Sequence, residues 1–180
     1  MRPGMEEIDV NDLRTNAGRL VKISVMGEVD HPTVGNTLYR IALDGGLRIP
    51  VGGPGIVNKV RVGDPATGWE ADHLEPCVSI RNNSGDRMTG ANGVLNALSC
   101  VGNQDTVVTG KAEGATGVVT GQHGGAERLM AVFTPDILTR MLPSDKVLVT
   151  PSGVGIKLLN YPDVRLFNLD LEFLHRMNIL

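Results

Sequence analysis

Short segments of alternating apolar and polar residues run along most of the chain. Val21, Ile23 and Val25 are separated by polar side chains, and Val60 and Val62 flank an arginine in the same way. A period of two is typical of strands that bury one face. Turn sequences rich in Gly, Asn and Asp separate the apolar segments. We therefore expect further strands at residues 38–43, 47–50, 76–80, 94–100, 106–109, 117–120, 128–133, 146–150, 156–159 and 164–167.

Two segments carry helix signals instead. Thr134 is a capping residue followed by Pro at the first helical position, and Asp170 is positioned to cap the second segment. Apolar side chains group on one face of each segment. The sequence therefore predicts short helices over residues 134–142 and 170–177. The fold expected from all these signals is mainly β, a short-stranded sandwich or barrel with two short helices.

A glycine-rich run lies after the middle of the chain. Gly110, Gly114 and Gly117 are spaced by four and then three residues and lead into apolar positions. This spacing is similar to the KOW motif of small SH3-like barrels in ribosomal and transcription proteins, where the glycines permit a tight turn between two strands. We expect residues 1–100 to form a β-rich domain with the candidate site. Residues 101–180 would form an SH3-like (KOW-like) small barrel plus the C-terminal helix, or both parts would make one compact unit.

Composition and charge narrow the class of protein. Cys77 and Cys100 lie in apolar runs, as reduced, buried thiols of cytosolic proteins do. No signal-peptide-like stretch begins the chain and no apolar run is long enough to cross a bilayer, so we expect a soluble, cytoplasmic protein without a membrane partner. The formal charge is -3, with 17 basic and 20 acidic residues intermixed, and aromatics are 3%. Nucleic acid is therefore not the expected partner, because neither a broad positive field nor stacking platforms are available.

Candidate chemistry concentrates between residues 62 and 80, which contain the single Trp, Trp69, and several carboxylates. On an extended chain His73 and Glu75 project from one face, and Asp72 points the other way. Two such groups make half of a metal site. A purely structural role is more common in proteins: His73 and Glu75 would hydrogen-bond nearby backbone, and Asp72 would cap a turn.

A third metal ligand is available from either of two histidines in expected loops, His31 or His123. Nitrogen and oxygen ligands of this kind suit a divalent metal such as zinc, and a catalytic site would keep one position for water. The spacing matches no fixed zinc signature. We expect Trp69, Asp72 and Lys111 to contribute to binding of a small-molecule ligand.

Six segments share a pattern with one known family: residues 20–28, 62–69, 72–76, 78–80, 96–103 and 117–125. Together they resemble domain-of-unknown-function family 4438 of bacteria and archaea. The resemblance implies a mainly β structure with a barrel-like part, and it implies no activity. Two departures stand out: family members are usually longer, with a further C-terminal domain, and Cys77 stands where the family has Gly.

The leading functional hypothesis is a protein that binds a small molecule or a metal near Trp69 to Glu75, with a metal-assisted hydrolase or lyase as its catalytic form. Two alternatives belong to other classes. One is a KOW-type RNA- or protein-interaction module that uses Lys111, His123 and Arg128. The other is an oligomeric assembly protein without catalytic activity, since edge strands invite subunit pairing. Under each hypothesis we expect a homo-oligomer.

Overall fold

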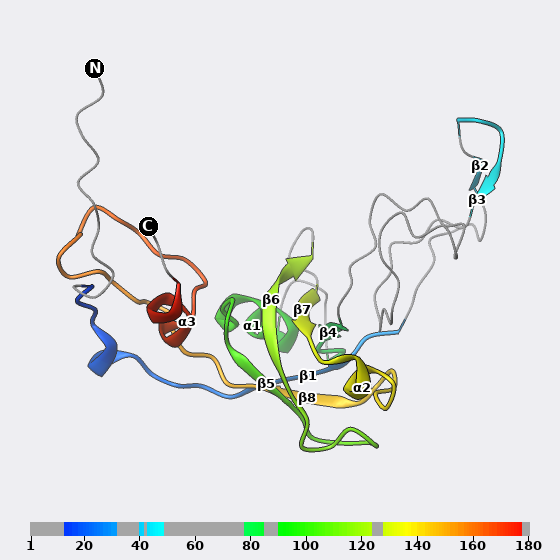
Figure 1. Ribbon diagram of the computed structural model, residues 1–180, viewed down its shortest axis with the longest axis horizontal. Helices are drawn as coiled ribbons and strands as arrows, with labels where there is room; N and C mark the ends of the chain where they lie inside the picture. The colour runs from blue at the N-terminus through cyan, green and yellow to red at the C-terminus, as the bar shows by residue number, and fades with distance from the viewer. Residues whose placement is uncertain are drawn as a thin grey trace.

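Six antiparallel strands close into a barrel in the order β1-β4-β7-β6-β5-β8 (Figure 1). The computed structural model describes residues 13–31, 40–41, 43–48, 78–84, 90–123 and 128–177. The strands are β1 (Val25–Val29), β4 (Val78–Arg81), β5 (Gln104–Val107), β6 (Thr116–His123), β7 (Arg128–Val132) and β8 (Lys146–Val149). The expected mainly β fold with a barrel is confirmed, and strands from both sides of residue 101 share the one barrel.

The interior of the barrel is filled by the apolar positions of the alternating pattern. Gly27 in β1 is part of this packing, because a Cβ there would lie 2.5 Å from Ile80 Cγ2 and 3.0 Å from Leu95 Cδ2. Close approach of the strand to its neighbours therefore requires Gly at this position. The fully buried apolar side chains of this core are Val29, Val78, Ile80, Leu95 of α1, Val107, Ala112, Val119, Leu129, Ala131, Val147 and Val149.

The strand predicted at residues 94–100 is wrong, because this segment belongs to helix α1 (Gly90–Leu98). Its buried positions Asn92, Leu95, Asn96 and Ser99 are spaced as one face of a helix. The side chains of Asn96 and Ser99 donate to carbonyls four residues earlier, at 2.9 and 2.6 Å. Helix α1 contacts β1 and β7. The apolar segment predicted as a buried strand is therefore a helix that packs against the barrel.

The two predicted helices are confirmed, although both are shorter than expected. Helix α2 spans Pro135–Leu138 after Thr134. Helix α3 spans Leu171–Arg176, and the Asp170 side chain accepts from Phe173 N at its start.

Other predicted strands form only in part. Val21 and Ile23 are exposed and precede β1, while β2 (Arg40–Ile41) and β3 (Leu47–Arg48) make a separate two-stranded sheet. The segments 156–159 and 164–167 are joined by the isolated bridge between Lys157 and Arg165. The strand expected around Val60 and Val62 lies outside the described residues.

The β5–β6 hairpin forms where the glycine spacing predicts a turn. Gly110 and Gly114 have φ values of 80° and 82°, which side chains rarely adopt. The barrel includes β1 and β4 as well as the strands after residue 101. The KOW character of the hairpin stays a prediction.

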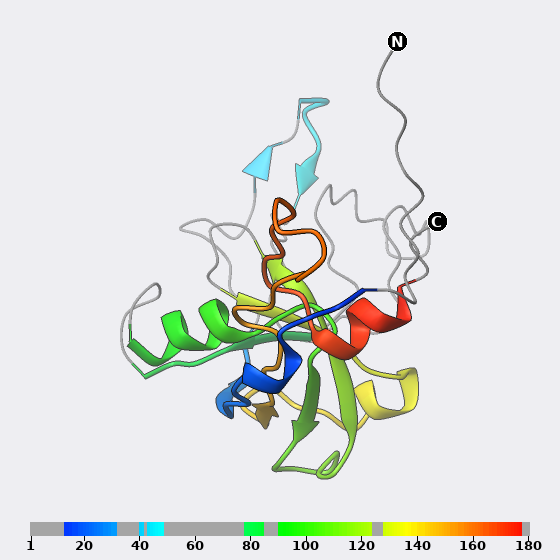
Figure 2. The same cartoon turned by 90° about the vertical axis from the view of Figure 1, so that its left-hand side faces the viewer.

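A second apolar cluster lies beside the barrel, where the 3-10 helix Ala17–Arg19 and its flanking residues approach α3 (Figures 1 and 2). Ile156, Leu158 and Leu174 form its buried centre. Asn103 connects the two clusters, because its Nδ2 donates to Asp170 Oδ2 at 2.8 Å and its Oδ1 accepts from Cys100 N at 2.7 Å. The segment after β8 is thus held against the barrel by buried hydrogen bonds.

No helix among the described ranges is long and apolar enough to cross a membrane. Cys100 is a free, buried thiol, and burial raises its pKa to about 11. It is therefore the packing residue that its apolar neighbours predict, because a nucleophilic cysteine needs an accessible thiolate. Cys77 lies outside the described residues.

One carboxyl group lies in the barrel interior. Asp105 in β5 is fully buried opposite Gly117, where a Cβ would lie 2.5 Å from Asp105 Oδ1 and 2.7 Å from Phe133 Cε1. Neither carboxylate oxygen has a hydrogen-bond partner of good geometry. Burial raises the pKa of Asp105 to about 7, although the nearby backbone N–H groups of Gly117 and Asp105 offset part of this effect.

The buried Asp105 predicts that the protein loses stability as the pH rises. The folded state holds this proton more tightly than the unfolded chain, whose pKa is near 3.8. The contribution of Asp105 to stability is then greatest below about pH 4 and falls until about pH 7, by up to about 4 kcal/mol. Asp105→Asn should remove most of this slope and raise the free energy of unfolding at pH 8, measured by urea titration. An unchanged slope in the variant would refute the assignment.

Candidate functional site

Charged side chains form a row on the outer face of four neighbouring strands. Glu28 in β1 is opposite Lys146 in β8 and Arg81 in β4, and the β4–β7 register aligns Arg81 with Arg128. The residues that alternate with them, such as Ile80, point into the core. Strand alternation therefore places these charged side chains on the outer face, and closure of the barrel brings their strands side by side.

A buried ion pair crosses the row diagonally. Arg128 Nε lies 2.6 Å from Asp30 Oδ2, and the two side chains are 14% and 6% exposed. Asp30 Oδ1 accepts from His31 N at 2.8 Å, and Asp30 N donates to Ser79 O at 2.9 Å. Removing one partner of such a pair typically costs about 3–5 kcal/mol, because the other charge stays buried. The pair ties the end of β1 to the start of β7 across β4.

Two buried polar atoms on the outer face of β4, Ser79 Oγ and Arg81 Nε, have no hydrogen-bond partner in the described part of the chain. Ser79 is 1% exposed, and the two residues project from the same side of the strand because they are two positions apart. Buried polar atoms in folded proteins are almost always paired, so two adjacent exceptions need an explanation. Both atoms are donors, and an acceptor oxygen between them would satisfy both.

A pocket of about 430 Å³, lined mostly by polar residues, lies beside Arg81. Glu28 accepts hydrogen bonds from Lys146 and Asn83, which hold the pKa of its carboxyl below the ordinary value. Glu28 is therefore ionised at neutral pH and is a poor general acid. The pocket is lined by Met26, Gly27, Glu28, Arg81, Asn82, Asn83, Ser84 and Lys146.

The loop that follows β4 is fixed in place around this pocket. Asn82 Nδ2 donates to Met26 O at 2.8 Å, and its Oδ1 accepts from Ser84 N at 2.9 Å. Asn82 N donates to Asn92 Oδ1 in α1 at 2.9 Å. The polar groups at the pocket are thus held by both β1 and α1 before any ligand arrives.

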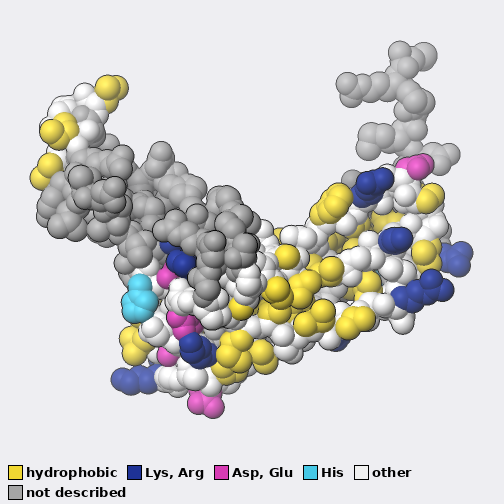
Figure 3. Space-filling model, turned by 180° about the vertical axis from the view of Figure 1, so that it is seen from behind, with side chains coloured by type: hydrophobic (Ala, Val, Ile, Leu, Met, Phe, Trp, Pro, Cys, Tyr) yellow, Lys and Arg dark blue, Asp and Glu magenta, His cyan; other side chains and the backbone are white. Residues whose placement is uncertain are grey.

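The charges of the outer face do not cancel. Lys146 pairs with Glu28 and Arg128 pairs with Asp30, whereas Arg81 has no ion pair among the described residues. Figure 3 shows acidic, basic and histidine side chains close together at one end of the molecule, while further basic side chains and many hydrophobic ones lie towards the other end. The arrangement favours an anion at Arg81.

Three of the sequence-predicted site residues, His31, Lys111 and His123, lie in the described part of the chain. His31 is exposed beyond the end of β1, and its Nε2 hydrogen-bonds Ser144 Oγ at 2.8 Å. Lys111 is exposed in the β5–β6 turn, and its carbonyl accepts from Arg140 Nη1 at 3.4 Å. His123 ends β6 opposite Arg128. Trp69, Asp72, His73 and Glu75 lie outside the described residues.

The length of β6 separates Lys111 from His123, since a strand of eight residues spans roughly 26 Å. Within the described ranges, no three His, Cys, Asp or Glu side chains are grouped as metal ligands.

Sequence reasoning missed Glu28, Asp30, Arg81 and Lys146. Their signal is the polar position that alternates with buried residues in β1, β4 and β8. The three strands are separated by about 50 or more residues in the chain, and alternation does not reveal which strands are neighbours.

The comparisons with known proteins agree with the fold. The family model described as "Domain of unknown function (DUF4438), N-terminal" matches residues 39–175. The chain belongs to this family. A solved structure, "Crystal structure of TM1086", is 37% identical to this DUF4438 chain, with a TM-score of 0.78. The match covers 93% of the DUF4438 chain. The chain covers 58% of that structure's length. Among curated proteins there is no match.

Proposed function

We propose that this DUF4438 chain binds a small polar molecule with an anionic oxygen group on the outer face of β1, β4 and β8. One observation carries the proposal: Ser79 Oγ and Arg81 Nε, two positions apart on β4, are buried and have no hydrogen-bond partner among the described residues. A carboxylate or phosphate oxygen accepts from both donors. A hydrogen bond to a charged group contributes about 1.5–3 kcal/mol, which offsets the cost of burying the Arg81 Nε donor there.

The rest of the pocket suits the polar part of such a ligand. Asn83 and Ser84 offer amide and hydroxyl groups, and the Glu28 carboxylate accepts from ligand hydroxyl or amino groups. The Lys146 ammonium adds positive charge on the far side of Glu28. A compact hydroxy acid or sugar phosphate has this combination of groups.

Titration with inorganic phosphate and with malonate tests the anion site. We expect saturable binding by isothermal calorimetry, at least tenfold weaker in Arg81→Met and several-fold weaker in Ser79→Ala. Arg140→Met is the matched control, since Arg140 is exposed and lies just after α2. Circular dichroism shows whether each variant is folded. Binding of neither anion, or equal binding by folded Arg81→Met, would contradict the proposal.

A second candidate is the metal-assisted hydrolase or lyase, with His73, Glu75, His31 and His123 as ligands of zinc or a similar ion. Its support is the Asp30–Arg128 ion pair. Asp30 precedes His31, and Arg128 is opposite His123, so this pair links the two backbone segments that carry these histidines.

Elemental mass spectrometry of protein purified without chelator tests the metal candidate. It predicts near-stoichiometric metal, lost in His73→Ala while circular dichroism stays unchanged. His175→Ala is the control, because His175 lies on α3 in the other apolar cluster. Metal-free native protein, or full occupancy in His73→Ala, would remove this candidate.

The two other hypotheses receive less support. Arg128 is paired with Asp30 and Lys111 lies far along β6 from His123, so the basic groups of an RNA site are few and scattered. Barrel closure pairs both edges of all six of its strands, which removes edges for assembly. The β2–β3 hairpin does expose Ile41, Leu43 and Leu47, and a homo-oligomer remains our expectation on that basis.

A further inference from the structure

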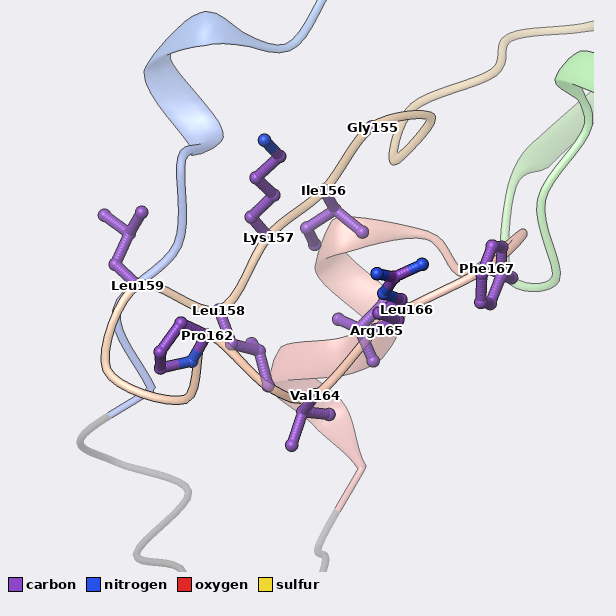
Figure 4. A pocket seen from close by; sticks show the side chains of 10 residues that line it. All are labelled: Gly155, Ile156, Lys157, Leu158, Leu159, Pro162, Val164, Arg165, Leu166 and Phe167. Atoms are coloured by element: carbon purple, nitrogen blue, oxygen red, sulfur yellow. The ribbon is translucent and has the colours of Figure 1, made fainter.

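An apolar groove of about 580 Å³ lies in the segment between β8 and α3, over the second apolar cluster (Figure 4). Ile156 and Leu158 are buried in its floor, whereas Leu159, Val164 and Phe167 are 54%, 45% and 78% exposed. Its volume is within the range of small-molecule pockets. This site is separate from the polar pocket on the barrel.

Two cationic side chains border the groove. Lys157 and Arg165 face each other in the isolated bridge that joins its two opposed segments. Like charges directly opposite in a β-pair are destabilising. Neither side chain has an acidic partner among the described residues. Figure 4 shows the two side chains on the opposed segments that line the groove, with the Lys157 side chain directed away from Val164. An unbalanced pair of charges at the edge of an apolar groove complements an anion with a hydrocarbon part.

The charge of the surrounding residues has the same sign. Residues 13–24 and 150–177 contain six Lys and Arg side chains against three carboxylates, in a chain of net charge -3. Asp170 is buried and accepts hydrogen bonds from Asn103 Nδ2 and Phe173 N, and Glu172 forms an ion pair with Arg176. Only Asp163 is left to balance the other basic groups of these two segments.

We propose that the groove binds a medium-chain alkyl carboxylate, with its carboxylate between Lys157 and Arg165 and its chain along Leu158 and Val164. Apolar burial contributes about 0.8 kcal/mol per methylene, so the chain supplies affinity and the two cations supply selectivity for the anion. No covalent step is involved.

Decanoate, kept below its micelle concentration, tests the proposal by displacement of a fluorescent fatty-acid analogue from the full chain. We expect saturable displacement, at least tenfold weaker in Lys157→Gln and Arg165→Gln, and weaker for decanol than for decanoate. Lys22→Gln removes an equal charge from the same part of the molecule and should bind as the native chain does. Arg81→Met should also bind decanoate normally, which separates this site from the anion site on the barrel.

Folding is not expected to limit this test, because removing one of two opposed like charges relieves repulsion. Each glutamine variant should melt at or above the temperature of the native chain without ligand. No displacement, equal affinity for decanol, or unchanged affinity in both variants would overturn the proposal. Adsorption to vesicles of anionic phospholipid without binding of monomeric decanoate would also overturn it, in favour of a membrane-contact surface.

Discussion

The structure depends on β1, the strand that pairs with β4 on one side and with β8 on the other. Val29 N donates to Asp145 O at 2.8 Å and Asp30 N donates to Ser79 O at 2.9 Å, so consecutive amides bind opposite neighbours. These contacts join parts of the chain separated by 49 and 116 positions, which makes closure costly in chain entropy. Closure places Gly27 against Ile80 and Leu95, and it completes an interior that buries both Asp105 and the apolar side chains.

The candidate site is a consequence of the same closure. Glu28 meets Lys146 and Arg81 only because β1 lies between β8 and β4, and Asp30 reaches Arg128 across β4. Among the described residues, these ion pairs engage both carboxylates of the outer face, Glu28 and Asp30. Arg81 and Ser79 are left with buried, unpartnered donors, which is the feature that favours an anionic ligand. The groove beside α3 has a different origin, because it forms in the segment that packs against the barrel through Asn103 and Asp170.

The sequence predicts the strands whose alternation is clear, and it predicts α3 from the Asp170 cap. It fails at α1, where Val94 to Leu98 resembles a buried strand, although Asn92, Leu95 and Asn96 have helical spacing. His31 was identifiable as a candidate site residue because it is polar and lies in a segment whose sequence predicts a loop. Glu28, Arg81 and Lys146 were not, because their meeting depends on strand order and register, which local patterns leave open. The Lys157–Arg165 pair was hidden for the same reason.

Amide hydrogen exchange followed by NMR tests barrel closure most directly. The amides of Val29 and Asp30 should exchange only through global unfolding, with protection equal to that of Val119 and Leu129 in β6 and β7. Equal protection on both sides of β1 would show that the strand closes the barrel. Fast exchange at Val29 or Asp30, at the rate of the exposed turn near Arg19, would contradict closure and with it the arrangement of the outer-face site.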